Sequence, residues 1–332
     1  MGNQPDPLTV TEPTSRSLGR HGWDFLACPR CRQDLPRVAD WLGEGIACAG
    51  CGVHYHVLGG IPRFVEADDY AGSFSFEWLR HRRTQLDGPG RDESERTFRE
   101  KTGLAPEDLQ DKLVLDVGCG MGRFADVVSR WGARVVAVDL SLAVEAAREN
   151  LAGRDNVVIC QADLFHLPFR EGQFNLIYSI GVLHHTPDCE QAFRNLVRFL
   201  APGGTIVIWL YAQDHGLWAK CSDFYRRWTV TMRSRALHRL CHIAVPFYYL
   251  VKLPVIGRIL WTLVPVSVHP DPDWRVLDTF DWYSPRYQSK HTYPEVYRWF
   301  QSEGLVQIKL LDVPVALSGV KPVYAGRSPH AR

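Results

Sequence analysis

The sequence carries almost no net charge. Its 332 residues include 38 lysines and arginines against 37 aspartates and glutamates, a formal net charge of +1. A dedicated nucleic-acid-binding protein usually has a strongly basic surface, so this balance argues against one, although a local basic face would still be compatible with it. The length exceeds that of one average domain, so we expect one large unit or two to three smaller ones.

The sequence also lacks an apolar segment of the secretory type in residues 1–20, which we expect to be a disordered tail because they are rich in Pro, Thr and Ser. Without such a segment, the nine cysteines indicate a reducing compartment, where cysteines bind metal or remain buried thiols. We therefore expect a cytoplasmic protein.

No apolar run is long and continuous enough to predict a membrane-spanning helix. The most apolar stretch, residues 243–268, is interrupted by three prolines, Lys252 and Arg258, whereas a span needs about 20 apolar residues. Residues 212–268 contain eight lysines and arginines but only two aspartates, and aromatic residues are interspersed among the cations. This composition is typical of peripheral contact with a membrane or lipid, of a lid over a hydrophobic substrate, or of a helical cap packed on its own core.

Two Cys-x-x-Cys pairs lie near the N-terminus, separated by a hairpin-sized segment. This spacing is typical of a structural zinc ribbon, in which four thiolates surround the metal. We predict such a ribbon at residues 21–66, with Cys28, Cys31, Cys48 and Cys51 as the zinc ligands. Because sulfur would fill all four positions, the metal would stabilise the ribbon and perform no chemistry.

The stretch Val114–Arg123 (VLDVGCGMGR) is the most informative in the chain. An apolar run ending in Asp-x-Gly-x-Gly-x-Gly predicts a buried strand, a glycine turn and a helix that begins near Arg123. Glycine leaves room for a ligand against bare backbone, and the helix N-terminus directs free N–H groups at the same place. A second apolar run ends about 20 residues later at Asp139, where an acid can bind the two ribose hydroxyls of a nucleoside.

The segments VLDVGCGMGR, VVAVDL, CQADLFHLPF, FNLIYSIGVLHH and LAPGGTIVI, taken in order, resemble the class I S-adenosylmethionine-dependent methyltransferases over roughly residues 107–211. The resemblance implies an α/β fold with a Rossmann-like seven-stranded sheet and S-adenosylmethionine as the cofactor. The positions that it implies for cofactor binding are Asp116, Gly118, Cys119, Gly120 and Gly122 (methionine end), Asp139 and Leu140 (ribose), Asp163 and Leu164 (adenine), and Ser179 and Ile180. A dinucleotide-binding domain is the alternative, but its Gly-x-Gly-x-x-Gly spacing is absent.

The remaining segments complete the predicted domain organisation. The ribbon resembles the zinc module that accompanies many methyltransferases, as a fusion or as a partner chain. Residues 67–106 would form a helical linker or cap, from which Phe76 or Trp78 would cover the methionine end, as an aromatic residue often does in related enzymes. The core would comprise residues 107–211 and 291–325, with a basic aromatic insertion, a substrate lid, at residues 212–290 before the last strands.

Methyl transfer is an in-line displacement with a neutral leaving group, so alignment can supply most of the acceleration, and an oxygen acceptor would also need a general base. Candidates at strand ends and in the insertion are His184, His185, Tyr211, Tyr283, Tyr287 and His291. Of these we single out His185, Tyr283 and Tyr287 as catalytic candidates. The polar and aromatic stretch 281–287, followed by His291, predicts a loop on the acceptor side.

We expect methyl transfer to a small-molecule acceptor at a hydroxyl, an amine or an activated carbon, including lipid- or sugar-linked metabolites. The alternatives are an RNA methyltransferase that uses the zinc module and a non-catalytic adaptor. Enzymes that methylate nucleobase amines usually carry an Asn/Asp-Pro-Pro-aromatic tetrad where this chain has Ser179-Ile180-Gly181-Val182, and a Pro-Cys nucleophile is also missing. Nucleic acid is therefore disfavoured, the intact cofactor motifs argue against an adaptor, and the sequence does not specify the oligomeric state.

Overall fold

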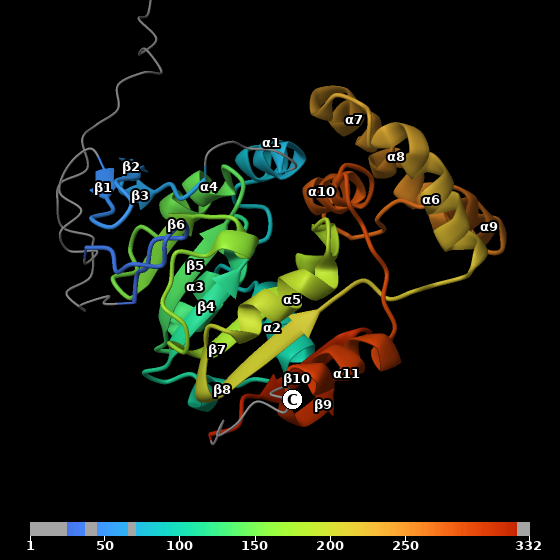
Figure 1. Cartoon of the computed structure of the whole chain (residues 1–332). Helices are drawn as coiled ribbons and strands as arrows, with labels where there is room; N and C mark the ends of the chain where they lie inside the picture. Colours follow the sequence, from blue (N-terminus) through green and yellow to red (C-terminus); the bar gives the residue numbers. More distant parts are fainter. Residues whose placement is uncertain (1–24, 37–44, 66–70, 324–332) are drawn as a thin grey trace, which may run out of the picture.

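A seven-stranded mixed sheet forms the centre of the molecule in the computed structural model, which describes residues 25–36, 45–65 and 71–323 (Figure 1). The strands, in spatial order, are β6 (Val157–Gln161), β5 (Arg134–Asp139), β4 (Leu113–Val117), β7 (Phe174–Ile180), β8 (Leu200–Trp209), β10 (Ala316–Val320) and β9 (Val306–Leu310). The first five are parallel, whereas β10 is antiparallel to both β8 and β9. The predicted Rossmann-like, seven-stranded α/β sheet is confirmed.

Helices cover both faces of this sheet because neighbouring strand residues point to opposite sides. Leu115 and its equivalents pack against α5 (Cys189–Val197) and α11 (Tyr293–Ser302). Val114 and its equivalents pack against the second layer, formed by α2 (Glu93–Thr102), α3 (Arg123–Arg130) and α4 (Ala143–Asn150). Three 3-10 turns complete the core, at Pro106–Asp108, Leu164–His166 and Leu183–His185.

The chain order reverses between β4 and β7. From β4 the parallel strands continue to β5 and β6, and from β7 they continue to β8 on the other side. In an open parallel sheet, such a reversal leaves a crevice at the carboxyl ends of the two strands, and ligands bind there. The glycine turn after β4 lies at this point.

Two segments differ from what their local sequence suggests, which is the end of a helix at Pro202-Gly203-Gly204 and a helix over the mixed-charge residues 80–101. Pro202-Gly203-Gly204 does not end a helix but lies inside β8, because Gly203 N donates to Lys321 O and Lys321 N donates to Gly204 O, both at 2.8 Å. The stretch from Arg80 to Lys101 is helical only from Glu93, after turns that are fixed by the Asp87 carboxylate, which accepts from two backbone N–H groups at the start of α2.

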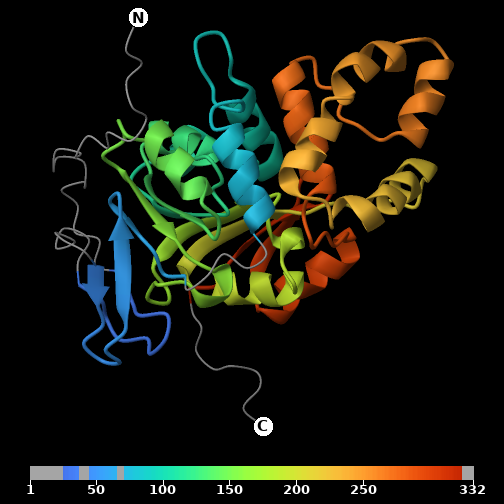
Figure 2. The ribbon, with the colours of Figure 1, turned by 90° about the horizontal axis from the view of Figure 1, so that it is seen from above.

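The N-terminal ribbon covers the outer edge of the sheet beside β6 (Figures 1 and 2). Its small antiparallel sheet consists of β1 (Gly45–Ala47), β2 (His54–Leu58) and β3 (Ile61–Pro62). Just after β3, Arg63 forms a parallel bridge with Gln161, and Phe64 N donates to Gln161 O at 2.8 Å. The ribbon therefore protects an edge strand whose backbone groups would otherwise stay unpaired.

The insertion forms a group of helices on the side of the molecule away from the ribbon (Figure 2). Its helices are α6 (Leu217–Thr229), α7 (Ser234–Cys241), α8 (Ala244–Val251), α9 (Ile256–Leu263) and α10 (Pro272–Tyr283). α10 packs between the other helices of the insertion and α1 (Gly72–Arg80), through a cluster that includes Phe280 and Leu237. Among the described residues, none of the helices combines the length and the apolar character that crossing a bilayer requires.

The contact between ribbon and core predicts shared stability. Phe25 is buried against Phe169 and Phe174, with ring centroids 5.7 and 5.9 Å apart. We expect Phe25→Ala to destabilise the whole core by about 3–5 kcal/mol, because it leaves a cavity that the two parts share. Thermal unfolding followed by tryptophan fluorescence measures this, with the exposed Leu58→Ala on the same ribbon as the control. An unchanged midpoint in Phe25→Ala would mean that the ribbon and the core unfold independently.

Candidate active site

The glycine turn after β4 leaves a cradle without side chains. Gly118 and Gly120 have φ values of +77° and +52°, which favour glycine over other residues. A Cβ on Gly118 would come within 2.4 Å of the Val182 side chain, and one on Gly120 within 3.2 Å of Trp78. Gly122 precedes the first residue of α3, so the prediction of a helix that begins at Arg123 is confirmed. The absence of a Cβ therefore lets Val182 and Trp78 pack directly on the backbone of the turn, and all four residues line one cavity.

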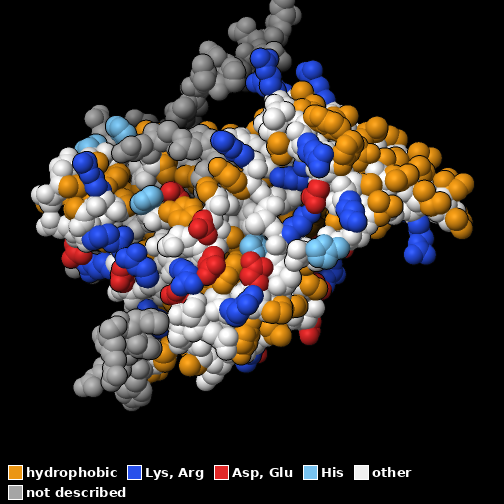
Figure 3. All heavy atoms as spheres, turned by 45° about the vertical axis from the view of Figure 1, so that its right-hand side comes forward, with side chains coloured by type: hydrophobic (Ala, Val, Ile, Leu, Met, Phe, Trp, Pro, Cys, Tyr) orange, Lys and Arg blue, Asp and Glu red, His pale blue; other side chains and the backbone are white. Residues whose placement is uncertain are grey.

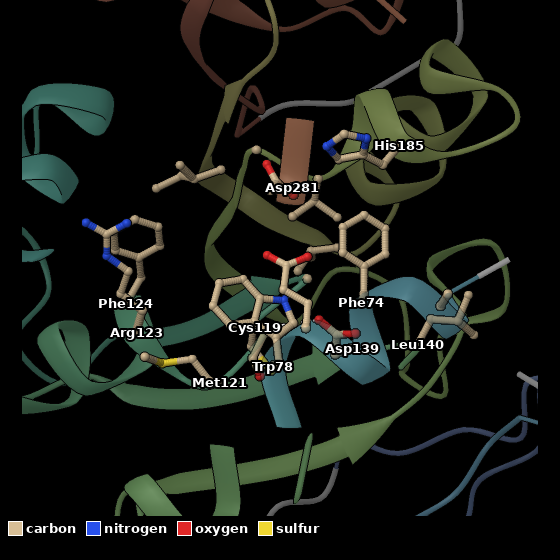
Figure 4. Close-up of a pocket in the computed structure, with 18 of the residues that line it drawn as sticks. Phe74, Trp78, Cys119, Met121, Arg123, Phe124, Asp139, Leu140, His185 and Asp281 are labelled. Carbon is tan, nitrogen blue, oxygen red and sulfur yellow. Dashed lines mark hydrogen bonds between the residues drawn. The ribbon is translucent and has the colours of Figure 1, made fainter. Parts of the chain in front are cut away.

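Asp139 lies at the end of β5, beside the glycine turn. Its Oδ2 accepts from Gly120 N at 2.9 Å, and its Oδ1 accepts from the backbone and hydroxyl of Ser141 at 2.8 and 2.7 Å. These bonds fix the carboxylate relative to the turn. Asp139 lines the same cavity as Gly118 and Gly120 (Figure 4).

An aromatic residue of α1 covers the glycine turn. Trp78 lies directly over Gly120 and lines the cavity together with Phe74. Phe76, the other residue considered at this position, packs instead against His238 and Phe280 of the insertion. The side chain that encloses the cavity is therefore Trp78.

The structure brings eight of the predicted site residues together around one cavity of about 320 Å³: Gly118, Cys119, Gly120, Asp139, Leu140, Leu164, Ile180 and His185. The other predicted positions are not among the residues that line it: Asp116, Gly122, Asp163, Ser179, Tyr283 and Tyr287. Asp163 caps the 3-10 turn that follows it by accepting from Phe165 N, and Ser179 donates to Val117 O. Asp116 is buried beneath the turn, and burial raises its pKa to about 7.

His185 faces the cavity from the side opposite Cys119 and Asp139 (Figure 4). Its Nδ1 lies 2.9 Å from the Tyr287 carbonyl oxygen, which can only accept, so Nδ1 carries the proton. Nε2 is then left with a lone pair, and it is buried with no hydrogen-bond partner among the described residues. Burial lowers the pKa of His185, so the ring is neutral near pH 7.

The other histidines and tyrosines considered as catalytic groups have structural contacts. His184 is fully buried and stacks on Tyr211 with ring centroids 3.9 Å apart. His291 bonds to Ser289 and to Glu295, and Tyr283 donates its hydroxyl to Pro265 O at 2.6 Å. None of these three lines the cavity, whereas Tyr211 does.

The predicted acceptor-side loop at residues 281–287 is partly helical. Asp281, Trp282 and Tyr283 form the last turn of α10, because Asp271 caps the helix start, Pro272 follows it and apolar residues continue at helical spacing. Asp281 and Trp282 nevertheless line the cavity, and the Tyr211 hydroxyl donates to Asp281 Oδ2 at 2.9 Å.

Some charged residues of the cavity were not predicted from the sequence, among them Glu77, Asp278 and Lys101. Glu77 on α1 is completely buried, neither of its carboxylate oxygens has a hydrogen-bond partner among the described residues, and burial raises its pKa strongly. Burial also raises the pKa of Asp278 to about 6 and lowers that of Lys101 to about 7. Only the folding of α1, α2 and α10 against the sheet brings these residues together, so no local pattern could have revealed them.

The four ribbon cysteines form a compact cluster. Their sulfurs all lie within 4.8 Å of one another, with Cys28 and Cys51 at 3.7 Å and Cys31 and Cys48 at 3.5 Å. The two pairs form equivalent turns: Arg32 N donates to Cys28 O, Gly52 N donates to Cys48 O, and Arg32 and Gly52 both have positive φ. The arrangement suits one tetrahedral metal ion.

Comparison with known proteins agrees with this geometry. Residues 115–208 match the family described as methyltransferase domain. A demethylmenaquinone methyltransferase from Thermobifida fusca is 35% identical over 117 residues, which cover 34% of this chain and 50% of that protein. A chloroplastic tocopherol O-methyltransferase from Arabidopsis thaliana is 36% identical over 114 residues, 32% of each chain, and a probable tRNA methyltransferase 9B from Mus musculus is 37% identical over 114 residues, 32% of this chain and 24% of that one.

The chain thus spans half or less of the length of the curated relatives that it matches. A solved structure of phosphoethanolamine N-methyltransferase 2 from Haemonchus contortus is 18% identical, covers 73% of this chain and 43% of that one, and has a TM-score of 0.41, a likeness too distant to carry a functional argument. The sheet order, the glycine turn and the family match agree on one conclusion. This chain contains a methyltransferase domain of the class I, S-adenosylmethionine-dependent type.

Proposed function

We propose that the protein transfers a methyl group from S-adenosylmethionine to a small-molecule acceptor that loses a proton in the reaction. One observation carries the proposal: His185, whose neutral ring keeps a lone pair without a hydrogen-bond partner on Nε2 among the described residues, lines the same cavity as the glycine turn. Two of the relatives are named for small-molecule acceptors, which supports the same class.

The residues present fit S-adenosylmethionine. Gly118 and Gly120 line the cavity with backbone alone, Asp139 offers a fixed carboxylate for the ribose hydroxyls, and Trp78 packs on Gly120 at the same end of the cavity. When bound, the cofactor supplies an electrophilic methyl group on a sulfonium sulfur. The glycine turn and Trp78 enclose one end of the cavity, and this enclosure excludes water from that end.

His185 would act as the general base. A hydroxyl of the acceptor that lies within hydrogen-bond reach of Nε2 can give up its proton there as an oxygen lone pair forms the new bond to the methyl carbon and the bond from that carbon to sulfur breaks. The Tyr287 carbonyl stabilises the resulting imidazolium by accepting from Nδ1. Tyr211 and Asp281 border the same end of the cavity and orient the acceptor.

A second acceptor class, a positively charged amine, is favoured by Glu77. This buried carboxylate lies near Asp278 and Asp281, whose charges contribute to raising its pKa. A cationic group would relieve both the repulsion and the lack of a hydrogen-bond partner. Transfer of a labelled methyl group to metabolite and lipid extracts, followed by product analysis for O-methyl or N-methyl groups, distinguishes the two classes.

The RNA alternative has less support. Four acids and two cations line the cavity, namely Glu77, Asp139, Asp278 and Asp281 against Lys101 and Arg123. RNA-binding sites are basic because they contact phosphates, so this lining disfavours them. Steep salt dependence of RNA binding would favour RNA, and an adaptor without activity would bind neither S-adenosylmethionine nor adenosylhomocysteine.

We also propose that the four cysteines bind one structural zinc ion. Bonds of 2.3 Å at the tetrahedral angle place sulfurs about 3.8 Å apart, close to the separations in the cluster. The Tyr55 hydroxyl lies 3.1 Å from Cys28 Sγ and would donate to the thiolate. With sulfur at all four positions, the ion would have no open site for catalysis.

Asp139→Asn should weaken S-adenosylmethionine binding by about tenfold or more, because a charged acceptor for two hydroxyl donors is lost while the shape is kept. Calorimetric titration with S-adenosylmethionine and adenosylhomocysteine measures the effect. Asp312→Asn, at an exposed carboxylate outside the cavity, is the matched control. If Asp139→Asn and the unmodified protein bind S-adenosylmethionine with equal affinity, Asp139 does not bind the ribose hydroxyls.

The pH dependence of kcat/KM should report His185. The base works only when neutral, so activity is present above its pKa and is lost as the pH falls through it. Because burial lowers that pKa, the acidic limb should lie below pH 6.5, the ordinary value for histidine. His185→Gln should abolish this limb and reduce the rate by about 10²- to 10⁴-fold, whereas His54→Gln on the ribbon should change neither. If His185→Gln leaves the pH profile of kcat/KM unchanged, His185 is not the general base.

Removal of zinc should destabilise the methyltransferase core and not only the ribbon, because both belong to one hydrophobic cluster. We expect one zinc ion per chain by elemental analysis and a lower thermal midpoint after treatment with a strong chelator. Cys31→Ser should reproduce that loss, and Cys221→Ser, outside the cluster, should not. Purified protein without zinc, or a midpoint that is insensitive to chelation, would contradict the proposal.

A further inference from the structure

The helical lobe, defined here as residues 217–268, exposes most of the large apolar side chains on the described surface. Of the twenty exposed ones, fourteen belong to the lobe: Leu217, Phe224, Trp228, Met232, Leu240, Ile243, Tyr249, Leu250, Leu253, Val255, Ile256, Ile259, Leu263 and Val268. In α8 only Ala244 is buried, and in α9 only Gly257. Figure 3 shows hydrophobic side chains gathered over the lobe. An area of this kind marks an interaction surface.

The charge around this apolar area has a single sign. The lobe contains eight lysines and arginines and only one acid, Asp223, which is already paired with Lys290 at 2.6 Å. One of the cations, Arg226, points inward and donates to the carbonyls of Trp282 and Pro285. The other seven are exposed: Lys220, Arg227, Arg233, Arg235, Arg239, Lys252 and Arg258.

We propose that the helical lobe docks on an anionic lipid surface. Exposed aliphatic and aromatic side chains bordered by cations suit the boundary between acyl chains and anionic headgroups. A second copy of the chain fits less well, since two such lobes would bring seven exposed cations each into contact. No described helix is long and apolar enough to cross a bilayer, so the lobe lies in the interface rather than across it.

Docking would bring the cavity close to the lipid. α10 packs on α6, α7 and α8 and lines the cavity through Leu277, Asp278, Asp281 and Trp282. The apolar surface and the cavity are thus separated by a single helix. An acceptor with a lipid anchor could reach the cavity from the docked position, but docking itself does not depend on the methyltransferase activity.

Sedimentation of the full-length, zinc-loaded chain with vesicles tests this proposal. We expect binding to phosphatidylcholine vesicles that contain about one third phosphatidylglycerol, weaker binding to phosphatidylcholine alone, and a decrease with salt. Two triple variants should each lower the partition coefficient by about 100-fold, one by removing exposed apolar side chains and one by removing cations. They are Val255→Ser with Ile256→Ser and Ile259→Ser, and Arg233→Ser with Arg235→Ser and Arg239→Ser.

Matched control variants change the same kinds of side chain outside the lobe. The apolar positions Leu58, Val306 and Leu310 are 57%, 44% and 56% exposed, against 71%, 58% and 56% for Val255, Ile256 and Ile259. The exposed cations for the second control are Lys112, Arg298 and Lys309. Serine at either control set should change the partition by no more than about twofold. Circular dichroism and the thermal midpoint verify that every variant is folded.

Three results would overturn the proposal. The first is that the chain does not sediment with anionic vesicles, and the second is that the control triples reduce binding as much as the lobe triples do. The third is that the chain does not bind vesicles but associates with itself or with a protein partner, and that the lobe triples abolish this association. Each result can be distinguished from failure of the methyltransferase proposal, because none of the measurements uses the cofactor or an acceptor.

Discussion

A buried guanidinium at the junction of ribbon and sheet connects the two halves of the structure. Arg63, just after β3 of the ribbon, donates to Gln161 Oε1 at 3.0 Å and pairs with Glu145 of α4. Gln161 Nε2 in turn donates to Leu140 O at 2.8 Å, one residue beyond Asp139. A buried cation that loses one partner is costly, so these groups hold one another in place. The conformation of the loop that carries Asp139 therefore depends on a residue supplied by the ribbon.

This connection gives the ribbon a structural role in the site. The ribbon has too few residues for a large core of its own, and its apolar side chains belong to the cluster under the central sheet. The proposed metal cross-link at the cysteines would fix the turns from which that packing begins. The cysteines lie outside the cavity, yet they restrain the strand edge from which the cofactor loop departs. The zinc proposal and the cofactor proposal are thus physically coupled.

The sequence revealed those parts of the site whose geometry is local. Gly118 and Gly120 need positive φ, and a carboxylate after the next strand lies beside them in any parallel sheet of this order, so the cradle could be predicted. The same holds for the two cysteine turns, whose backbone bonds span four residues. The assignment of His185 used its place after β7, but the Tyr287 carbonyl that fixes its tautomer lies 102 residues later.

The parts that were missed depend on distant segments. Glu77 follows an aromatic run in which it could equally well have faced solvent, and only the docking of α10 on α1 buries it. Residues 281–283 of the loop predicted at residues 281–287 are helical because a cap at Asp271, ten residues before Asp281, begins a helix that the lobe then stabilises. Burial depends on what packs from elsewhere, and spacing along the chain does not contain that information.

The charged groups of the cavity interact with one another, and its buried carboxylates require either protons or a cation. Glu77, Asp278 and Asp281 lie near one another on α1 and α10. Burial also lowers the pKa of Lys101. Desolvated carboxylates of this kind either take up protons or hold a cation. A positively charged ligand would lower their pKa values and release protons as it binds, while a neutral ligand would leave at least Glu77 protonated. The structure therefore links the occupancy of the cavity to the protonation of α1 and α10, the two helices that join the sheet to the helical lobe.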